Sequence, residues 1–220
     1  MAGGLAASLG VGISLIAHLT TVARAPDLAV QITYASSPLA LLIGGWLGAR
    51  HARRDMWRAP APWAAVIGGG VVAGLAVKLL TEVVAVWEQA VTGPISGNNP
   101  VTLYPHAFSG IGPRLVLAVA VVAVAPAGEE TFFRGLLYGR LRRRWGVGPA
   151  SIVAGLLFGL AHADPWPVQS VLASLPLALP LAMVGVAFCL LYERYRTLWL
   201  TASAHAAFNA TSLVAVFWGH

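Results

Sequence analysis

Long apolar runs separated by short polar stretches dominate the pattern of this sequence. Most of these runs reach or approach the roughly 20 residues that a helix needs to cross a hydrocarbon core. The pattern therefore predicts an all-α fold, a polytopic transmembrane helical bundle of about seven spans that forms a single integral membrane domain over residues 1–220. The seven segments cover about residues 4–23, 29–49, 62–91, 113–139, 149–163, 167–192 and 197–218.

Composition strengthens this prediction. Hydrophobic residues make up 58% of the chain and charged residues only 10%. A soluble domain of this length would carry more polar surface, because its outer faces must meet water. Residues 1–23 resemble a secretory signal in being apolar and in preceding an A-x-A sequence, Ala23-Arg24-Ala25. They have no basic residue before the apolar run, however, so we expect a retained first span.

The net charge of +6 does not indicate a nucleic-acid partner, because the arginines lie in short loops and not in aromatic-basic stripes. If the spans alternate in direction, the loops at 50–58, 140–145 and 193–196 share one side and hold ten arginines. The other side holds only Arg24 and Arg114. The positive-inside rule then places the three basic loops in the cytoplasm. The Ala/Arg/Gly-rich composition suggests the cell membrane of a bacterium.

Three ionisable residues interrupt the segment at 113–139. An ionisable side chain at the centre of a membrane helix costs roughly 2.5–3.5 kcal/mol, so Glu129, Glu130 and Arg134 call for a structural or chemical reason. Glu130 and Arg134 are four residues apart and can pair on one helix face. Glu129 is rotated by about 100° from Glu130, which leaves it free to face a cavity.

Two later segments carry polar residues at comparable depth. His162 ends the segment at 149–163, and the last segment holds His205 and Asn209 on one helix face. With a rise of about 1.5 Å per residue, Glu129, His162 and His205 lie roughly 14–20 Å along their helices from the basic loops. We therefore expect one polar site inside the bilayer, reachable from the cytoplasmic side.

A carboxylate with two imidazoles suits hydrolysis by either of two routes. In one, Glu129, His162 and His205 bind Zn²⁺ or another divalent metal, which activates a water molecule. In the other no metal takes part: Glu129, helped by His162, removes a proton from water, and His205 and Asn209 hydrogen-bond the developing oxyanion. The sequence contains no H-E-x-x-H motif that would decide between the two routes.

Around these residues the chain resembles the CAAX-protease and bacteriocin-processing family (CPBP, or Abi) of intramembrane endopeptidases. The family signature is E-E-x-x-x-R, often continued as F-R-G-x-L, then F-x-x-x-H and H-x-x-x-N. The short motifs are common alone, whereas the ordered trio is specific. The resemblance covers about residues 113–212. The matching residues are Glu129-Glu130-Thr131-Phe132-Phe133-Arg134-Gly135-Leu136-Leu137, Phe158-Gly159-Leu160-Ala161-His162 and His205-Ala206-Ala207-Phe208-Asn209.

The resemblance implies a helical bundle around a catalytic cavity and a membrane-anchored or hydrophobic peptide substrate. Both metal-dependent and glutamate-dependent descriptions apply to the family. Its bacterial relatives are linked to bacteriocin maturation or self-immunity, so a non-catalytic scaffold or immunity protein that binds a peptide in the same cavity is the alternative function. A transporter with a Glu/His proton relay is a third possibility, which the absence of an inverted repeat disfavours.

Overall fold

The computed structural model describes residues 26–48, 53–58, 62–92, 104–162 and 168–218. All regular structure within these ranges is helical, which confirms the all-α fold class. The predicted first span at 4–23 lies outside the described residues. The helices are α2 (Pro26–Gly48), α3 (Arg53–Met56), α4 (Trp63–Thr92), α6 (Ile111–Val119), η1 (Ala120–Val124), α7 (Ala125–Glu129), η2 (Glu130–Tyr138), α8 (Gly139–Trp145), α9 (Val147–Leu160), α10 (Val168–Tyr195) and α11 (Leu198–Trp218).

Five helical segments are long and apolar enough to cross a membrane: Val30–Gly48, Trp63–Val91, Ile111–Trp145, Ala178–Tyr195 and Leu198–Phe217. Large apolar side chains point outward along these segments; examples are Val72, Leu79 and Trp87, each about two-thirds exposed. Such surfaces are unfavourable in water and suited to lipid. They are the surfaces of an integral membrane protein.

The segment predicted at 149–163 corresponds to α9, a helix that is shorter than a membrane span. α9 has 14 residues, about 21 Å at the usual rise, which is less than the thickness of a hydrocarbon core. It begins directly after Gly146, whose φ of 80° is accessible to glycine at little cost and turns the chain out of α8. The helix ends at Leu160, so that His162 lies in the turn just beyond it and not on the helix itself.

Glycines allow two pairs of helices to approach closely. α4 lies against α11 at Gly74, where an added Cβ atom would overlap the carbonyl group of Ala204. α9 lies against α10 at Gly159, where a Cβ atom would overlap the carbonyl group of Ala178. Small residues at helix contacts are a general means of packing membrane helices, because the apolar lipid provides little drive for association. These contacts hold α9 and α11 in place.

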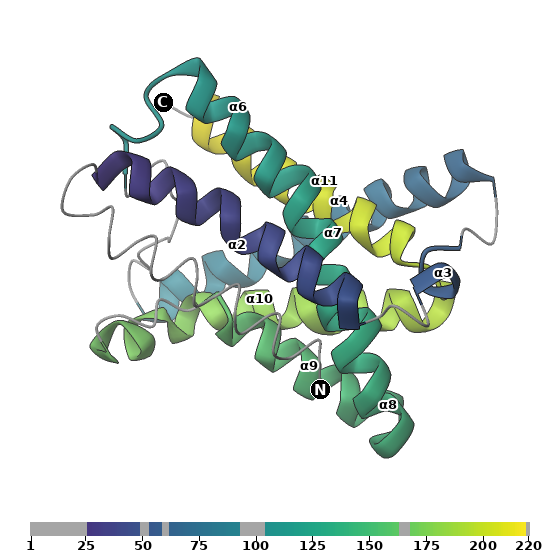
Figure 1. The fold of residues 1–220 in the computed structure, drawn as a ribbon. Helices are drawn as coiled ribbons and strands as arrows, with labels where there is room; N and C mark the ends of the chain where they lie inside the picture. The colour runs from purple at the N-terminus through teal and green to yellow at the C-terminus, as the bar shows by residue number, and fades with distance from the viewer. Residues whose placement is uncertain (1–25, 49–52, 59–61, 93–103, 163–167, 219–220) are drawn as a thin grey trace.

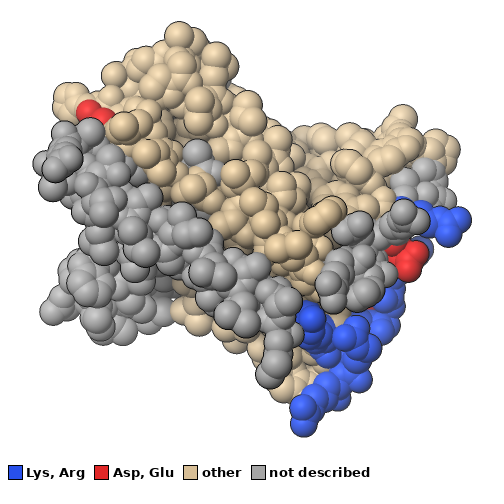
Figure 2. Space-filling view, viewed as in Figure 1, with Lys and Arg blue, Asp and Glu red and all other residues tan. Residues whose placement is uncertain are grey.

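The basic loops meet at one end of the molecule, as the alternation of spans predicts. Figure 2 shows Lys and Arg side chains gathered around α3 and α8, while the other described residues on this face are almost free of them. Glu193, near the end of α10, accepts hydrogen bonds from Arg142 of α8, Tyr138 of η2 and Arg196. The ring of Trp57, just after α3, packs edge-on against that of Trp199 in the first turn of α11, with 4.8 Å between the ring centres.

A mainly aromatic core lies in the middle of the bundle. Its buried members come from η2, α9, α10 and α11, which cross near one another in Figure 1. They are Phe133, Phe158, Val184, Phe188, Ala204 and Phe208. Two charged side chains, those of Glu130 and Arg134, lie fully buried beside this core. A pair of opposite charges in such surroundings needs direct contact and further polar partners to persist.

Candidate active site

The two adjacent glutamates lie where a long helix changes its winding. α6, η1, α7, η2 and α8 form one uninterrupted helical run from Ile111 to Trp145, in which η1 and η2 are π-helical. Wider π turns redirect side chains and are frequent at functional sites. Gly128 lies against the backbone of α2 near Pro38 and Leu42, where a Cβ atom would collide. α2 thus supports this helix immediately before Glu129.

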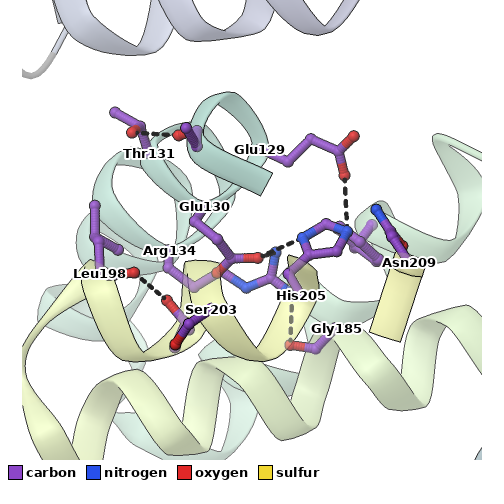
Figure 3. A network of polar contacts seen from close by, with 12 residues as sticks. Glu129, Glu130, Thr131, Arg134, Gly185, Leu198, Ser203, His205 and Asn209 are labelled. Carbon is purple, nitrogen blue, oxygen red and sulfur yellow. Dashed lines mark hydrogen bonds and ion pairs between the residues drawn. The ribbon is translucent and has the colours of Figure 1, made fainter. Parts of the chain in front are cut away.

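Glu130 connects the arginine of its own helix with a histidine of α11. Its Oε1 atom lies 2.9 Å from Nη1 of Arg134, and the side chains of both residues are completely buried. The same oxygen lies 3.0 Å from Nδ1 of His205. Figure 3 shows the three side chains in sequence between η2 and α11. The predicted pair of Glu130 and Arg134 is therefore present, and it extends to His205.

Arg134 is enclosed by aromatic rings and one carbonyl group. Its guanidinium carbon lies 4.5 Å from the ring centre of Phe158 and 5.2 Å from that of Phe188. Its Nη2 atom approaches the carbonyl oxygen of Gly185 at 3.4 Å. Cation–π contacts are strongest away from water, so these rings replace part of the hydration that a buried guanidinium has lost. The cage fixes the cation that holds Glu130.

The contact with Glu130 determines how His205 is presented. A carboxylate can only accept, so Nδ1 of His205 carries the proton and donates it to Glu130. The imidazole is further held between Phe158 and Phe188, whose ring centres lie 5.8 and 5.6 Å away. Its second nitrogen, Nε2, is then directed towards Glu129 Oε2 at 3.9 Å.

His162 is oriented in the same manner by a backbone group. Its Nδ1 atom lies 2.8 Å from the carbonyl oxygen of Phe158, which can only accept, so Nδ1 is again the protonated nitrogen. Its Nε2 atom lies 3.8 Å from Glu129 Oε2. Its side chain is 30% exposed, against 12% for Glu129 and 4% for His205. His162 therefore forms the more accessible side of the site.

Three acceptor atoms thus converge on one place. Oε2 of Glu129 is buried and has no hydrogen-bond partner within the described part of the chain, and both imidazole Nε2 atoms are directed towards it. A carboxylate oxygen and two imidazole nitrogens at this spacing suit an occupant that donates hydrogen bonds or carries positive charge, such as water or a cation. The side chains do not close to metal-binding distances: among the described residues, no group of three His, Cys, Asp or Glu forms a metal site.

Asn209 lies one turn beyond His205 on α11 but has a further partner. Its Nδ2 atom donates to the carbonyl oxygen of Val121 at 2.9 Å. Val121 belongs to the π-helical η1, so the amide ties α11 to the irregular part of the neighbouring helix. One amide hydrogen is engaged in this contact, and the second remains for a ligand.

The structure brings together Glu129, Glu130, Arg134, His162 and His205, with Asn209 at the edge of the group. Sequence reasoning missed Phe188 and the carbonyl group of Gly185, both in α10, which hold Arg134 and His205. The segment at 167–192 has no charged residue before its end, so nothing in its sequence marks these two positions. Phe158 belongs to the F-x-x-x-H motif, and its ring packs against the rings of both His162 and His205.

Comparisons with known proteins match the part of the chain that contains these residues. Residues 111–211 match the family described as Rce1-like, type II CAAX prenyl endopeptidase, which confirms the resemblance indicated by the motifs. The chain is 27% identical over 97 residues to the Bacillus subtilis (strain 168) protein named "Putative membrane peptidase YdiL". That match covers 44% of this chain and only 35% of the relative, about a third of its length. No solved structure matches the chain significantly.

Proposed function

We propose that this chain, whose residues 111–211 match the Rce1-like endopeptidase family, is an intramembrane endopeptidase that hydrolyses a peptide bond in a membrane-anchored or hydrophobic peptide. The observation that carries the proposal is the convergence of Glu129 Oε2 with the Nε2 atoms of His162 and His205. These groups lie among membrane-spanning helices. Ionisable side chains are costly there, so their presence favours a functional site.

In the proposed reaction, Glu129 and His162 hold a water molecule through its hydrogens. As the water oxygen bonds to the peptide carbonyl carbon, Glu129 takes up a proton, and it returns that proton to the amine nitrogen as the C–N bond breaks. Asn209 donates its remaining amide hydrogen to the oxyanion. His205, one turn before Asn209 on the same helix, presents its Nε2 atom to the same place.

The same donors fit a divalent metal in their chemistry. Glu129, His162 and His205 would hold it, since each presents an unshared electron pair at the common point. When bound, Zn²⁺ would supply Lewis-acid activation of the water. Glu130 would then act as the carboxylate that orients a ligating histidine, a common arrangement behind metal ligands. The described spacing is wider than such a site requires, so this route needs the side chains to move closer.

The surroundings of the site support a substrate that reaches it from the membrane. The outer faces of α4 and of the long helix after Ile111 are apolar and exposed, as a lipid-facing surface would be. We place the basic end, around α3 and α8, in the cytoplasm of a bacterial cell by the positive-inside rule. His162 provides the more exposed approach to Glu129.

The test uses protein reconstituted in lipid nanodiscs and a set of hydrophobic peptides with a quenched fluorophore. The wild type should cleave at least one peptide, and Glu129→Gln should reduce its turnover to background. Glu82→Gln is the matched control, because Glu82 pairs with Lys78 on α4 and is more than half exposed. Loss of turnover with a chelator, restored by added Zn²⁺, would favour the metal route; unchanged turnover would favour the glutamate route. Peptide binding without cleavage by the wild type would instead favour a scaffold or immunity protein.

A further inference from the structure

An apolar groove lies outside the candidate active site, between the start of the long helix and the last turns of α11. Its volume is about 300 Å³. Leu115 and Val214, on its two sides, are 59% and 54% exposed, so the groove opens on the surface that faces lipid. Its lining also includes Arg114, Ala118, Val122, Ala210 and Phe217.

Among the described residues that line the groove, Arg114 alone is charged. Its Nε atom donates to the carbonyl oxygen of Phe108 at 2.9 Å, and its guanidinium carbon lies 5.3 Å from the ring centre of Phe217. These contacts fix the plane of the guanidinium group and leave its two terminal nitrogens without an anionic partner in the described part of the chain. Two such nitrogens form the planar fork that binds phosphate well.

The position of Arg114 matches the depth of a lipid headgroup. It is the fourth residue of the span Ile111–Trp145, so it lies near the membrane surface, at the end of the helix away from α8. The groove extends from this level to Val122, about 12 Å further along the helix at 1.5 Å per residue. A cation at the surface with an apolar channel leading inward from it is complementary to a phospholipid, in which a phosphate precedes an acyl chain.

We propose that this groove binds one phospholipid, with its phosphate on Arg114 and one acyl chain between α6 and α11. The inner end of the groove is lined by Val122 and Ala210, which follow directly on Val121 and Asn209. These last two residues form the hydrogen bond that ties α11 to η1. A bound lipid thus fills the space beside the contact that secures α11 near the candidate active site.

Native mass spectrometry of the detergent-purified protein, titrated with dioleoylphosphatidylglycerol, tests this proposal. The wild type should retain one lipid. Arg114→Gln should weaken its binding about tenfold, as expected for loss of a charge-assisted hydrogen bond. Ala118→Leu should weaken it similarly by filling the groove. Arg143→Gln removes an exposed arginine from α8, at the opposite end, and should bind as the wild type does.

The proposal requires that both groove variants lose binding while the Arg143 control keeps it, with all four proteins eluting as the same folded species. Equal retention by the wild type and both groove variants would overturn it, as would loss in only one of them. If a peptide substrate occupied the groove instead, Arg114→Gln would raise KM and leave lipid retention unchanged, which also contradicts the proposal. Lipid mass is read directly, so the result does not depend on whether the chain proves to be a peptidase.

Discussion

Nδ1 of His205 lies 3.0 Å from Oε1 of Glu130, the same oxygen that contacts Arg134 at 2.9 Å. Glu130 therefore has two roles at once: it neutralises a fully buried guanidinium group and fixes the orientation of a histidine on another helix. The two adjacent glutamates divide the chemistry between them. Glu130 positions His205, and Glu129 faces the point where a reacting group can lie.

Replacing Glu130 by Gln should lower turnover more than it weakens substrate binding. Glutamine keeps the size of the side chain but removes the charge that orients His205, and such supporting carboxylates are worth about 10–100-fold. We expect kcat to fall in that range per folded protein, with KM nearly unchanged. Steady-state kinetics in nanodiscs measures both quantities. An unchanged kcat would show that His205 does not act through Glu130.

Arg134→Gln should destabilise the protein strongly, because it leaves the carboxylate of Glu130 buried without a cation and with His205 as its remaining polar partner. Removing one member of a buried ion pair typically costs about 3–5 kcal/mol. The double variant Glu130→Gln/Arg134→Gln removes both charges, and it should recover part of this loss in stability, with a turnover no higher than that of Glu130→Gln. Thermal unfolding in detergent gives the comparison. A single variant as stable as the wild type would contradict the interpretation of the buried pair.

Gly74→Ala should disturb the site without touching any of its polar residues. A Cβ atom at position 74 would overlap the carbonyl group of Ala204, the residue before His205, so α4 must move away from α11. We expect lower thermal stability and lower turnover. Gly69→Ala is the control on the same helix, since a Cβ atom there meets nothing within 4 Å. Equal effects of the two substitutions would show that the close helix contact does not position His205.

The orientation of the protein can be tested by labelling single cysteines in a Cys189→Ala background, which removes the native thiol. Ser109 and Arg143 are both exposed and lie at opposite ends of the long helical run. A maleimide that cannot cross membranes should label Ser109→Cys in intact cells and label Arg143→Cys only after permeabilisation. The reverse pattern would place the basic end outside the cell.

Much of the fold could be predicted from the sequence because lipid imposes a simple rule on the backbone: apolar segments of sufficient length become helices. The segment expected at 62–91 is α4 at Trp63–Thr92, and the segment expected at 197–218 is α11 at Leu198–Trp218. The end of α9 could be predicted less exactly. The predicted segment ran to residue 163, whereas the helix ends at Leu160 and His162 lies in the turn beyond it.

The candidate site was predictable where charge in an apolar segment marked it, and not where apolar atoms complete it. Glu129, His162 and His205 were predicted to share one site because each is polar at a similar depth. Glu130 contacts His205 as well as Arg134 because α11 crosses η2 at this point. The crossing of the two helices cannot be predicted from a single sequence. The role of Phe188 and the π-helical winding of η1 and η2 depend on tertiary packing in the same way.

The proposed peptidase activity depends above all on Glu129. The most direct measurement compares peptide N- and C-termini in membranes from cells that express the wild type, Glu129→Gln or the matched control Glu82→Gln, at equal abundance of folded protein. We expect new termini with the wild type and with Glu82→Gln, and we expect them to be absent with Glu129→Gln. Identical termini in all three membranes would contradict it and would favour a protein that binds peptides without cleaving them.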